Sequence, residues 1–100
     1  EMGLVNYSAA KAGVLGFTKA LAQETARKNI TVNAIAPGYI DTEILSDASE
    51  EFLKSLITKI PVGRLGTVDE ISRIVTFLVS EDAGFVTGST ITANGGQYFI

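Results

Sequence analysis

The sequence predicts an α/β fold built on a parallel sheet. Two apolar segments rich in β-branched residues, 30–36 and 89–93, have the length and composition of strands. Roughly fifty residues with two helical patterns separate them, and a long helical crossover joins parallel strands rather than a hairpin. Because parallel sheets rarely consist of two strands alone, we expect the chain to complete a larger sheet, supplied by residues outside it or by a partner chain.

The predicted order is helix, strand, helix, helix, strand. Residues 4–28 contain no proline and many alanines, and their apolar side chains recur every three or four positions, which predicts one long helix. The recurring positions include Ala10, Val14, Phe17 and Leu21. Glycine weakens a helix, so we expect Gly13 and Gly16 to serve close approach of another backbone.

Residues 30–36 are expected to form a buried strand that ends at Pro37 and Gly38. A loop over residues 38–45 follows, and Ser46 or Asp47 can cap a helix running to about residue 59. The apolar side of that helix is expected to carry Phe52, Leu53, Leu56 and Ile57.

Residues 67–70 have the spacing of a capping box, with Thr67 and Glu70 at its two ends. A helix over 68–80 is expected to follow, with Asp69 as a first-turn acid that suits the helix dipole. Arg64 is expected to anchor the preceding loop. Residues 81–88 form a glycine-bearing loop before the last strand, which ends in an Asn94-Gly95-Gly96 turn.

Composition narrows the chemistry that the chain can perform. Hydrophobic residues make up 46% of the 100 residues, so a buried core is expected. With 11 acidic and 8 basic residues and no basic cluster, the net charge of −3 argues against a nucleic-acid partner. Cysteine and histidine are absent, which removes thiolate and imidazole chemistry and most metal sites, so no metal is expected. The sequence has no membrane-spanning run and no signal-peptide pattern at its beginning, so we expect no membrane contact and a cytoplasmic location.

Tyr7 and Lys11 are the candidate reactive pair. Their spacing on a helix places both side chains on one face, about a turn apart. A phenol is a poor acid or base near neutral pH, but a neighbouring ammonium group favours the phenolate and makes proton transfer possible. By itself this spacing more often marks a solvated helix face, so the pattern needs support from other motifs.

Four motifs together resemble the short-chain dehydrogenase/reductase family. They are NYSAAKAG at 6–13, TVNAIAPGYIDT at 31–42, GRLG at 63–66, and TG at 87–88 with NGG at 94–96. The resemblance covers nearly the whole chain and is closest to the branch that reduces 3-ketoacyl thioesters such as acetoacetyl-CoA or ketoacyl-acyl carrier protein. It implies the C-terminal part of a Rossmann-type doubly wound parallel sheet, so that residues 1–100 are the catalytic half of a single domain.

The resemblance also implies roles for the reactive pair. Tyr7 matches the family's catalytic tyrosine, which donates a proton to the substrate carbonyl oxygen as hydride arrives from the reduced nicotinamide. Lys11 matches the lysine that binds the nicotinamide ribose and favours ionisation of the tyrosine. The cofactor is expected to be a nicotinamide dinucleotide, with NADP favoured over NAD.

The loop after the first strand matches the family's contact with the nicotinamide end of the cofactor. The matching residues are Pro37, Gly38, Ile40 and Thr42. Gly38 would allow close backbone approach, and Thr42 would contribute its hydroxyl. Tyr39 is expected either to face the substrate or to be an ordinary exposed aromatic residue. Residues 45–61 resemble the family's mobile substrate-binding helices.

Several family features are expected upstream of Glu1: the glycine-rich phosphate loop, the residue that selects NAD or NADP, and the active-site serine and asparagine. We therefore expect a fragment of a longer or split reductase, inactive alone, that is complemented by an N-terminal half or assembles as a homo-oligomer. The alternative is a non-catalytic, self-associating remnant. A sugar epimerase with the same tyrosine and lysine is a third reading, disfavoured because those relatives carry a longer C-terminal substrate domain.

Overall fold

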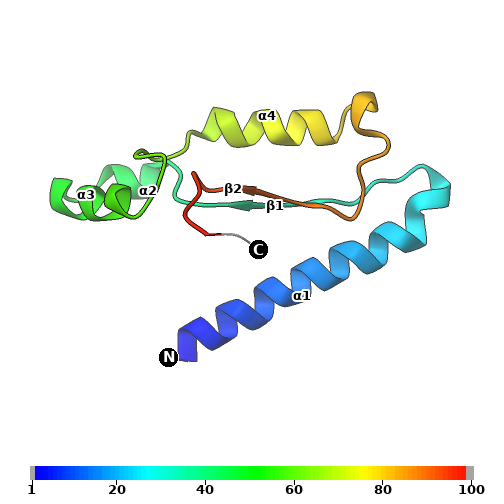
Figure 1. Cartoon of the computed structure of the whole chain (residues 1–100), viewed down its shortest axis with the longest axis horizontal. Coiled ribbons are helices and arrows are strands. Elements are labelled where there is room, and N and C mark those ends of the chain that lie inside the picture. Colours follow the sequence, from blue (N-terminus) through cyan, green and yellow to red (C-terminus); the bar gives the residue numbers. More distant parts are fainter. Residues whose placement is uncertain (1, 99–100) are drawn as a thin grey trace. The chain divides into compact units, whose positions relative to one another are not determined.

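The computed structural model describes residues 2–98 of the chain, and Figure 1 shows the order of their helices and strands. The elements are α1 (Met2–Thr25), the 3-10 turn η1 (Ala26–Lys28), β1 (Ala34–Pro37), α2 (Glu43–Ser46), α3 (Glu50–Thr58), α4 (Val68–Leu78), the 3-10 turn η2 (Glu81–Ala83) and β2 (Thr90–Ala93). The predicted order is confirmed, and the short helix α2 lies where only a loop was predicted.

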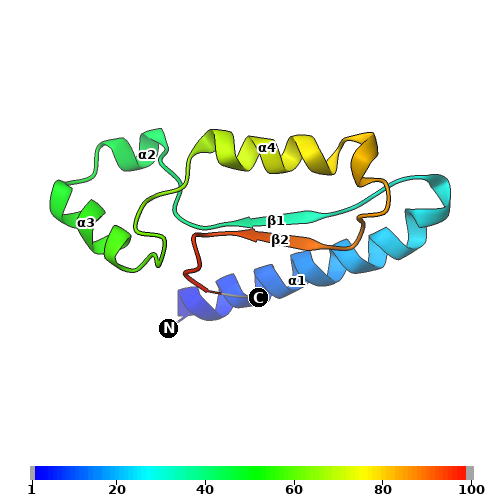
Figure 2. The same ribbon diagram turned by 45° about the horizontal axis from the view of Figure 1, so that its top comes forward.

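β1 and β2 are hydrogen-bonded neighbours (Figure 2). Ala34 N donates to Ser89 O at 2.9 Å, and Gly38 N donates to Ala93 O at 3.0 Å. The paired positions advance together along both segments, so the strands are parallel. This confirms the α/β class and fits part of a Rossmann-type sheet. The prediction of a buried first strand is wrong, because its residues are half-buried and Pro37 is exposed.

β1 begins at Ala34 rather than at Ile30, and side chains supply several of the hydrogen bonds in the segment before it. Asn33 Nδ2 donates to Val86 O at 3.0 Å, and Asn33 Oδ1 accepts from Ser89 N at 3.1 Å. A carboxamide offers one donor group and one acceptor group, as a peptide unit does. Asn33 thereby extends the pairing of the two segments beyond the regular ladder.

The buried side of α1 carries Thr18 and Ala22, which are 4% and 3% exposed. A Cβ placed on Gly88 would lie 3.5 Å from the Ala22 side chain, so the turn before β2 packs against this side of the helix. Gly88 has a φ of 74°, a backbone conformation that glycine adopts without strain. α1 is therefore held by small residues.

The predicted apolar positions of α1 do not form its buried side. Val14 and Phe17 are 56% and 65% exposed. Among the described residues, nothing lies within 4 Å of a Cβ built on Gly13 or on Gly16. The expected close backbone approach at these glycines therefore does not occur among residues 2–98. The apolar period of the helix correctly predicted the helix but not which side is covered.

α3 begins later than predicted because its N-cap is Ser49, not Ser46 or Asp47. Ser49 Oγ accepts a hydrogen bond of 3.1 Å from Phe52 N. Ser46 instead ends α2, and its hydroxyl donates to Glu43 O at 2.7 Å. Of the predicted apolar side of this helix, Leu56 is buried, whereas Phe52 is 50% exposed.

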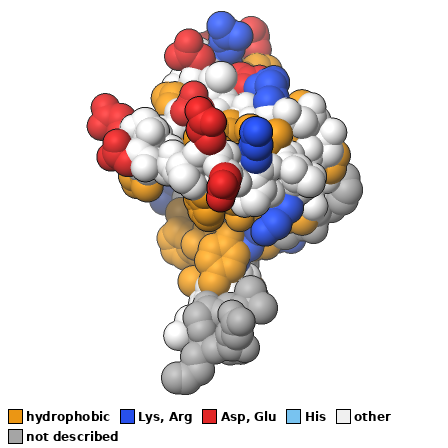
Figure 3. Space-filling view, turned by 90° about the vertical axis from the view of Figure 1, so that its left-hand side faces the viewer, with side chains coloured by type: hydrophobic (Ala, Val, Ile, Leu, Met, Phe, Trp, Pro, Cys, Tyr) orange, Lys and Arg blue, Asp and Glu red, His pale blue; other side chains and the backbone are white. Residues whose placement is uncertain are grey.

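The chain divides into two compact units. The first comprises Glu1–Ala34 and Leu78–Ile91, and the second comprises Ile35–Phe77 and Thr92–Ile100. Acidic and basic side chains are intermingled on the face that carries α2 and α3 (Figure 3). Within residues 2–98, no helix combines the length and the apolar character needed to cross a membrane.

Candidate active site

Tyr7 and Lys11 lie on the same side of α1, as their spacing predicted. The Lys11 Nζ atom lies 5.8 Å from the centroid of the Tyr7 ring, within the range of a cation–π contact. The Tyr7 side chain is 59% exposed, and Lys11 is half-buried. A phenol open to a ligand therefore stands beside a positive charge that a regular helix holds in place.

The loop from Pro37 to Thr42 is braced by residues distant in the sequence. On one side, Gly38 N donates to Ala93 O at 3.0 Å. On the other, Gly66 N donates to Tyr39 O at 3.0 Å and Asp41 N donates to Gly66 O at 2.8 Å. These two bonds form an isolated parallel bridge between Ile40 and Gly66. The loop is thus an extension of β1 with backbone partners on both sides.

Gly38 is required by its contact with Asn94. A Cβ at position 38 would lie 2.6 Å from the Asn94 Cβ and 2.8 Å from its Cα, distances at which one of the two segments must move. The sequence interpretation was that this glycine admits the cofactor. The observed close neighbour is Asn94, the residue after β2, so packing inside the chain is sufficient to require glycine here. Contact of Gly38 with the cofactor stays a prediction.

Asn94 holds the turn after β2 together through its side chain. The sequence predicted the turn but not these side-chain hydrogen bonds. Asn94 is 8% exposed. Its Oδ1 accepts from Gly96 N at 3.0 Å, and its Nδ2 donates to Tyr98 O at 2.7 Å. Gly95 and Gly96 have φ values of 67° and 88°. The residue order could have indicated this role, because an asparagine side chain often hydrogen-bonds the backbone two residues further along a turn.

Ile40 and Thr42, the other predicted cofactor residues, differ in their surroundings. The Ile40 side chain lies over Gly66, where an added Cβ would come within 2.8 Å of its Cδ1 atom. Thr42 is exposed and is the N-cap residue of α2, but its side chain makes no capping hydrogen bond. The Thr42 hydroxyl is therefore not committed to the helix that it precedes.

A cavity of about 370 Å³ lies in the second unit, next to this loop. Of the predicted site residues, it is lined by Tyr39, which is 40% exposed, and by Ile40. Most of its wall was not predicted from the sequence, because it comes from segments far apart in the chain. The other lining residues are Val62, Arg64, Gly66, Glu70, Ile71, Arg73, Ile74, Ala93, Asn94 and Gly95.

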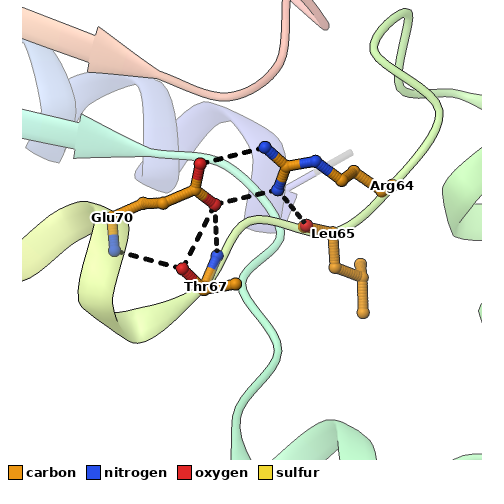
Figure 4. Close-up of polar contacts among 4 residues, drawn as sticks. All are labelled: Arg64, Leu65, Thr67 and Glu70. Atoms are coloured by element: carbon orange, nitrogen blue, oxygen red, sulfur yellow. Dashed lines mark hydrogen bonds and ion pairs between the residues drawn. The ribbon is translucent and has the colours of Figure 1, made fainter.

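Arg64, Thr67 and Glu70 form a polar cluster at the start of α4 (Figure 4). Arg64 Nη1 and Nη2 donate to the two Glu70 carboxylate oxygens at 2.8 Å and 2.9 Å, and Nη1 also donates to Leu65 O at 3.0 Å. Thr67 N donates to Glu70 Oε1 at 2.9 Å, and Glu70 N donates to Thr67 Oγ1 at 3.1 Å. The predicted capping box and the predicted loop anchor are both confirmed.

The charges of this cluster stabilise each other. The hydrogen bond from Arg64, followed by the backbone hydrogen bond from Thr67, lowers the pKa of Glu70 from 4.5 to about 2. The same partner carboxylate raises the pKa of Arg64 above its ordinary value. The pair therefore remains ionised at any pH at which the fold would be expected to function.

The predicted site residues fall into two groups. Tyr7 and Lys11 belong to the first unit, and their side chains are together. Pro37, Gly38, Tyr39, Ile40 and Thr42 belong to the second, on one continuous braced loop. The structure describes each group by itself, and their assembly around one ligand remains a prediction.

Comparison with known proteins agrees with these motifs. A family model described as Enoyl-(Acyl carrier protein) reductase matches residues 2–97. An acetoacetyl-CoA reductase from Shinella zoogloeoides is 66% identical over 100% of this chain and 42% of its own length. A 3-oxoacyl-[acyl-carrier-protein] reductase FabG from Pseudomonas aeruginosa is 51% identical over 96% of this chain and 39% of its own length. A nodulation protein G from Azospirillum brasilense is 55% identical over 96% of this chain and 39% of its own length.

The chain spans about two fifths of the length of these curated relatives. The matched segment contains the tyrosine–lysine helix, the proline–glycine loop and the final glycine turn described above. The chain therefore belongs to the short-chain dehydrogenase/reductase family of oxidoreductases.

Proposed function

We propose that the chain is the C-terminal, catalytic part of an NAD(P)H-dependent reductase that acts on a 3-ketoacyl thioester, such as acetoacetyl-CoA or a ketoacyl-acyl carrier protein. The names of its relatives support this substrate class. Because those relatives are more than twice as long, we further propose that an N-terminal half completes the same Rossmann-type domain.

The observation that carries the proposal is the contact between Lys11 Nζ and the Tyr7 ring at 5.8 Å. A bound reduced nicotinamide would supply hydride to the substrate carbonyl carbon. The Tyr7 hydroxyl then donates its proton to the carbonyl oxygen, which leaves an alcohol product and a phenolate. The Lys11 ammonium, which lies beside the Tyr7 ring, would hydrogen-bond the cofactor ribose, and a solvent proton restores the phenol.

The loop at the end of β1 has groups that suit the nicotinamide end of a dinucleotide. We assign this contact to Pro37, Gly38, Ile40 and Thr42. The Thr42 hydroxyl is exposed and makes no capping bond, so it can bond a polar group of the ligand. Ligands of open α/β sheets bind beyond the carboxyl ends of the strands, where this loop lies. The family branch favours NADP over NAD.

The substrate is assigned to the neighbourhood of Tyr39 and to the segment 45–61. Tyr39 is 40% exposed at the wall of the cavity, so its ring can contact an acyl chain. α3 and the last two residues of α2 lie in that segment, and movement of these helices would admit the thioester. A cytoplasmic location, and assembly either with a second copy or with a separate N-terminal half, are parts of the same proposal.

A chimera tests this function directly. The chain would replace the segment that it matches in the Shinella zoogloeoides relative, with which it shares 66% identity, so that the N-terminal part comes from that protein. Acetoacetyl-CoA is added with NADPH, and nicotinamide oxidation is followed by absorbance. We expect turnover by the chimera and none by the 100-residue chain alone.

Tyr7→Phe removes only the hydroxyl that donates the proton and should lower kcat by about 10² to 10⁴-fold. Lys11→Met removes the positive charge while keeping a good helix former, and it should also reduce turnover strongly. Ser8→Ala is the matched control, since it removes one hydroxyl from an exposed neighbour on the same helix. Full activity of Tyr7→Phe would contradict the proposed role of this residue.

A second candidate function is a non-catalytic module that associates with itself. The observation in its favour is the uncovered apolar side of α1, where Val14 and Phe17 are 56% and 65% exposed. Sedimentation of the 100-residue chain with Phe17→Lys as a comparison would test it. If this function is correct, the 100-residue chain should sediment as an oligomer and its Phe17→Lys variant as a monomer. The chimera described above should then be inactive.

A further inference from the structure

The backbone of the proposed cofactor loop is held by a segment outside the loop. Gly66 accepts from Asp41 N at 2.8 Å and donates to Tyr39 O at 3.0 Å, so Ile40 lies between two bonds made by one residue. Thr42 follows directly. Any displacement of Gly66 would therefore move the part of the loop that we assign to the cofactor.

Gly66 is in turn held by the ion pair across it. Arg64 lies on its N-terminal side and Glu70 on its C-terminal side, and the pair joins them by two parallel hydrogen bonds of 2.8 Å and 2.9 Å (Figure 4). Glu70 also accepts from Thr67 N, the amide directly after Gly66. The turn that contains Gly66 is therefore closed by side chains, with the carboxylate as the common acceptor.

We propose that Arg64 and Glu70 are positioning residues for the nicotinamide cofactor, acting through Gly66 on the backbone between Tyr39 and Thr42. The inference rests on the proposed function and adds two residues that act on the cofactor through the backbone of the loop. Exposed ion pairs contribute little to overall stability, but this pair has bidentate geometry and backbone partners, the arrangement in which such a pair fixes a conformation.

Two variants remove different parts of the pair. Glu70→Gln keeps an oxygen acceptor for Thr67 N but loses the charge. Arg64→Lys keeps the charge but cannot form two parallel bonds to one carboxylate. Asp69→Asn is the matched control, because it neutralises the adjacent acid in the same first turn of α4.

The first measurement is hydrogen exchange of backbone amides in the chimera. Glu70→Gln and Arg64→Lys should speed exchange at Gly66 and Asp41 by about five-fold or more, because their bonds open more often. The amide of Gly38, which bonds Ala93 O on the other side of the loop, should be unchanged. Asp69→Asn should leave all three amides as they were.

The second measurement is steady-state kinetics of the same proteins. A loop that binds the cofactor equally in ground and transition states affects KM and not kcat, so both variants should raise the KM for NADPH about five-fold while kcat stays within about two-fold. A merely structural role would reduce the amount of folded enzyme, which lowers apparent kcat at an unchanged KM.

The outcomes separate this inference from the proposed function. Unchanged exchange at Gly66 and Asp41 overturns the inference, whether or not the protein is a reductase. Faster exchange with an unaltered KM overturns it as well. An inactive chimera with normal folding contradicts the proposed function instead, and the inference then fails with the function on which it rests.

Discussion

Different kinds of interaction place the Tyr7–Lys11 pair on α1 and the loop at the end of β1. Tyr7 and Lys11 meet because helical geometry repeats every 3.6 residues, so a spacing of four is sufficient to bring them together. The loop is placed by hydrogen bonds to Ala93 and Gly66, which lie far along the chain. Local geometry therefore determines the first site, and long-range contacts determine the second.

The largest expected difference between the loop and α1 is in stability when one glycine in each region is replaced by alanine. Gly38→Ala places a Cβ 2.6 Å from the Asn94 side chain and 2.8 Å from its backbone, and it should destabilise the fold by ~1–3 kcal/mol. Gly13→Ala meets nothing within 4 Å among the described residues and should stabilise α1 by up to ~1 kcal/mol. Urea unfolding of the chimera measures both.

If the two alanine variants had equal stability, the loop would be able to move away from Asn94 at little cost. That outcome would contradict the conclusion that long-range contacts hold the loop more tightly than they hold this part of α1. It would also mean that packing against Asn94 does not require glycine at position 38.

A smaller effect on stability is expected from Ser49, the observed N-cap of α3, and from Ser46, one of the two caps predicted from the sequence. Ser49→Ala removes the oxygen that accepts from Phe52 N and should cost ~1 kcal/mol in urea unfolding. Ser46→Ala removes only a hydroxyl that donates to Glu43 O at the surface and should change stability by less than ~0.5 kcal/mol. A larger loss of stability in Ser46→Ala than in Ser49→Ala would favour Ser46, as predicted from the sequence, as the N-cap of α3.

The smallest expected effect is a pH dependence of the stability that Glu70 contributes. The pKa of Glu70 is lowered from 4.5 to about 2 by Arg64 and Thr67, so the folded state binds its proton less readily than the unfolded state does. The resulting stabilisation is complete above pH 4.5 and is lost as the pH falls toward 2. The difference in urea midpoint between the parent protein and Glu70→Gln should narrow over this window. A difference that does not vary with pH would show that the charge of Glu70 contributes nothing.

The parts of the molecule that could be predicted from the sequence are those with local causes. The structure confirms three such predictions: the helix α1, the capping box of Thr67 and Glu70, and the contact of Tyr7 with Lys11. Each depends on residues that are close together in the sequence. The parallel pairing was also predictable, because the length of the crossover excludes a hairpin.

The errors have long-range causes. The start of β1 depends on Asn33 bonding residues 86 and 89, which no local pattern in 30–36 reveals. The covered side of α1 depends on what packs against Ala22, and small residues give a weak apolar signal. Within the candidate site, the link from Gly38 to Asn94 joins two motifs that were recognised separately but not as neighbours.

The pairing of Val32 with Thr87 has a consequence for the order of folding. Their hydrogen bond joins residues 55 positions apart, and the ends of this long segment must meet before the first rung of the sheet can form. Helices such as α1 and α4 need no such encounter and can form early. Folding should therefore be limited by closure of the sheet, and the bond from Gly38 N to Ala93 O should form only in that last, slow step.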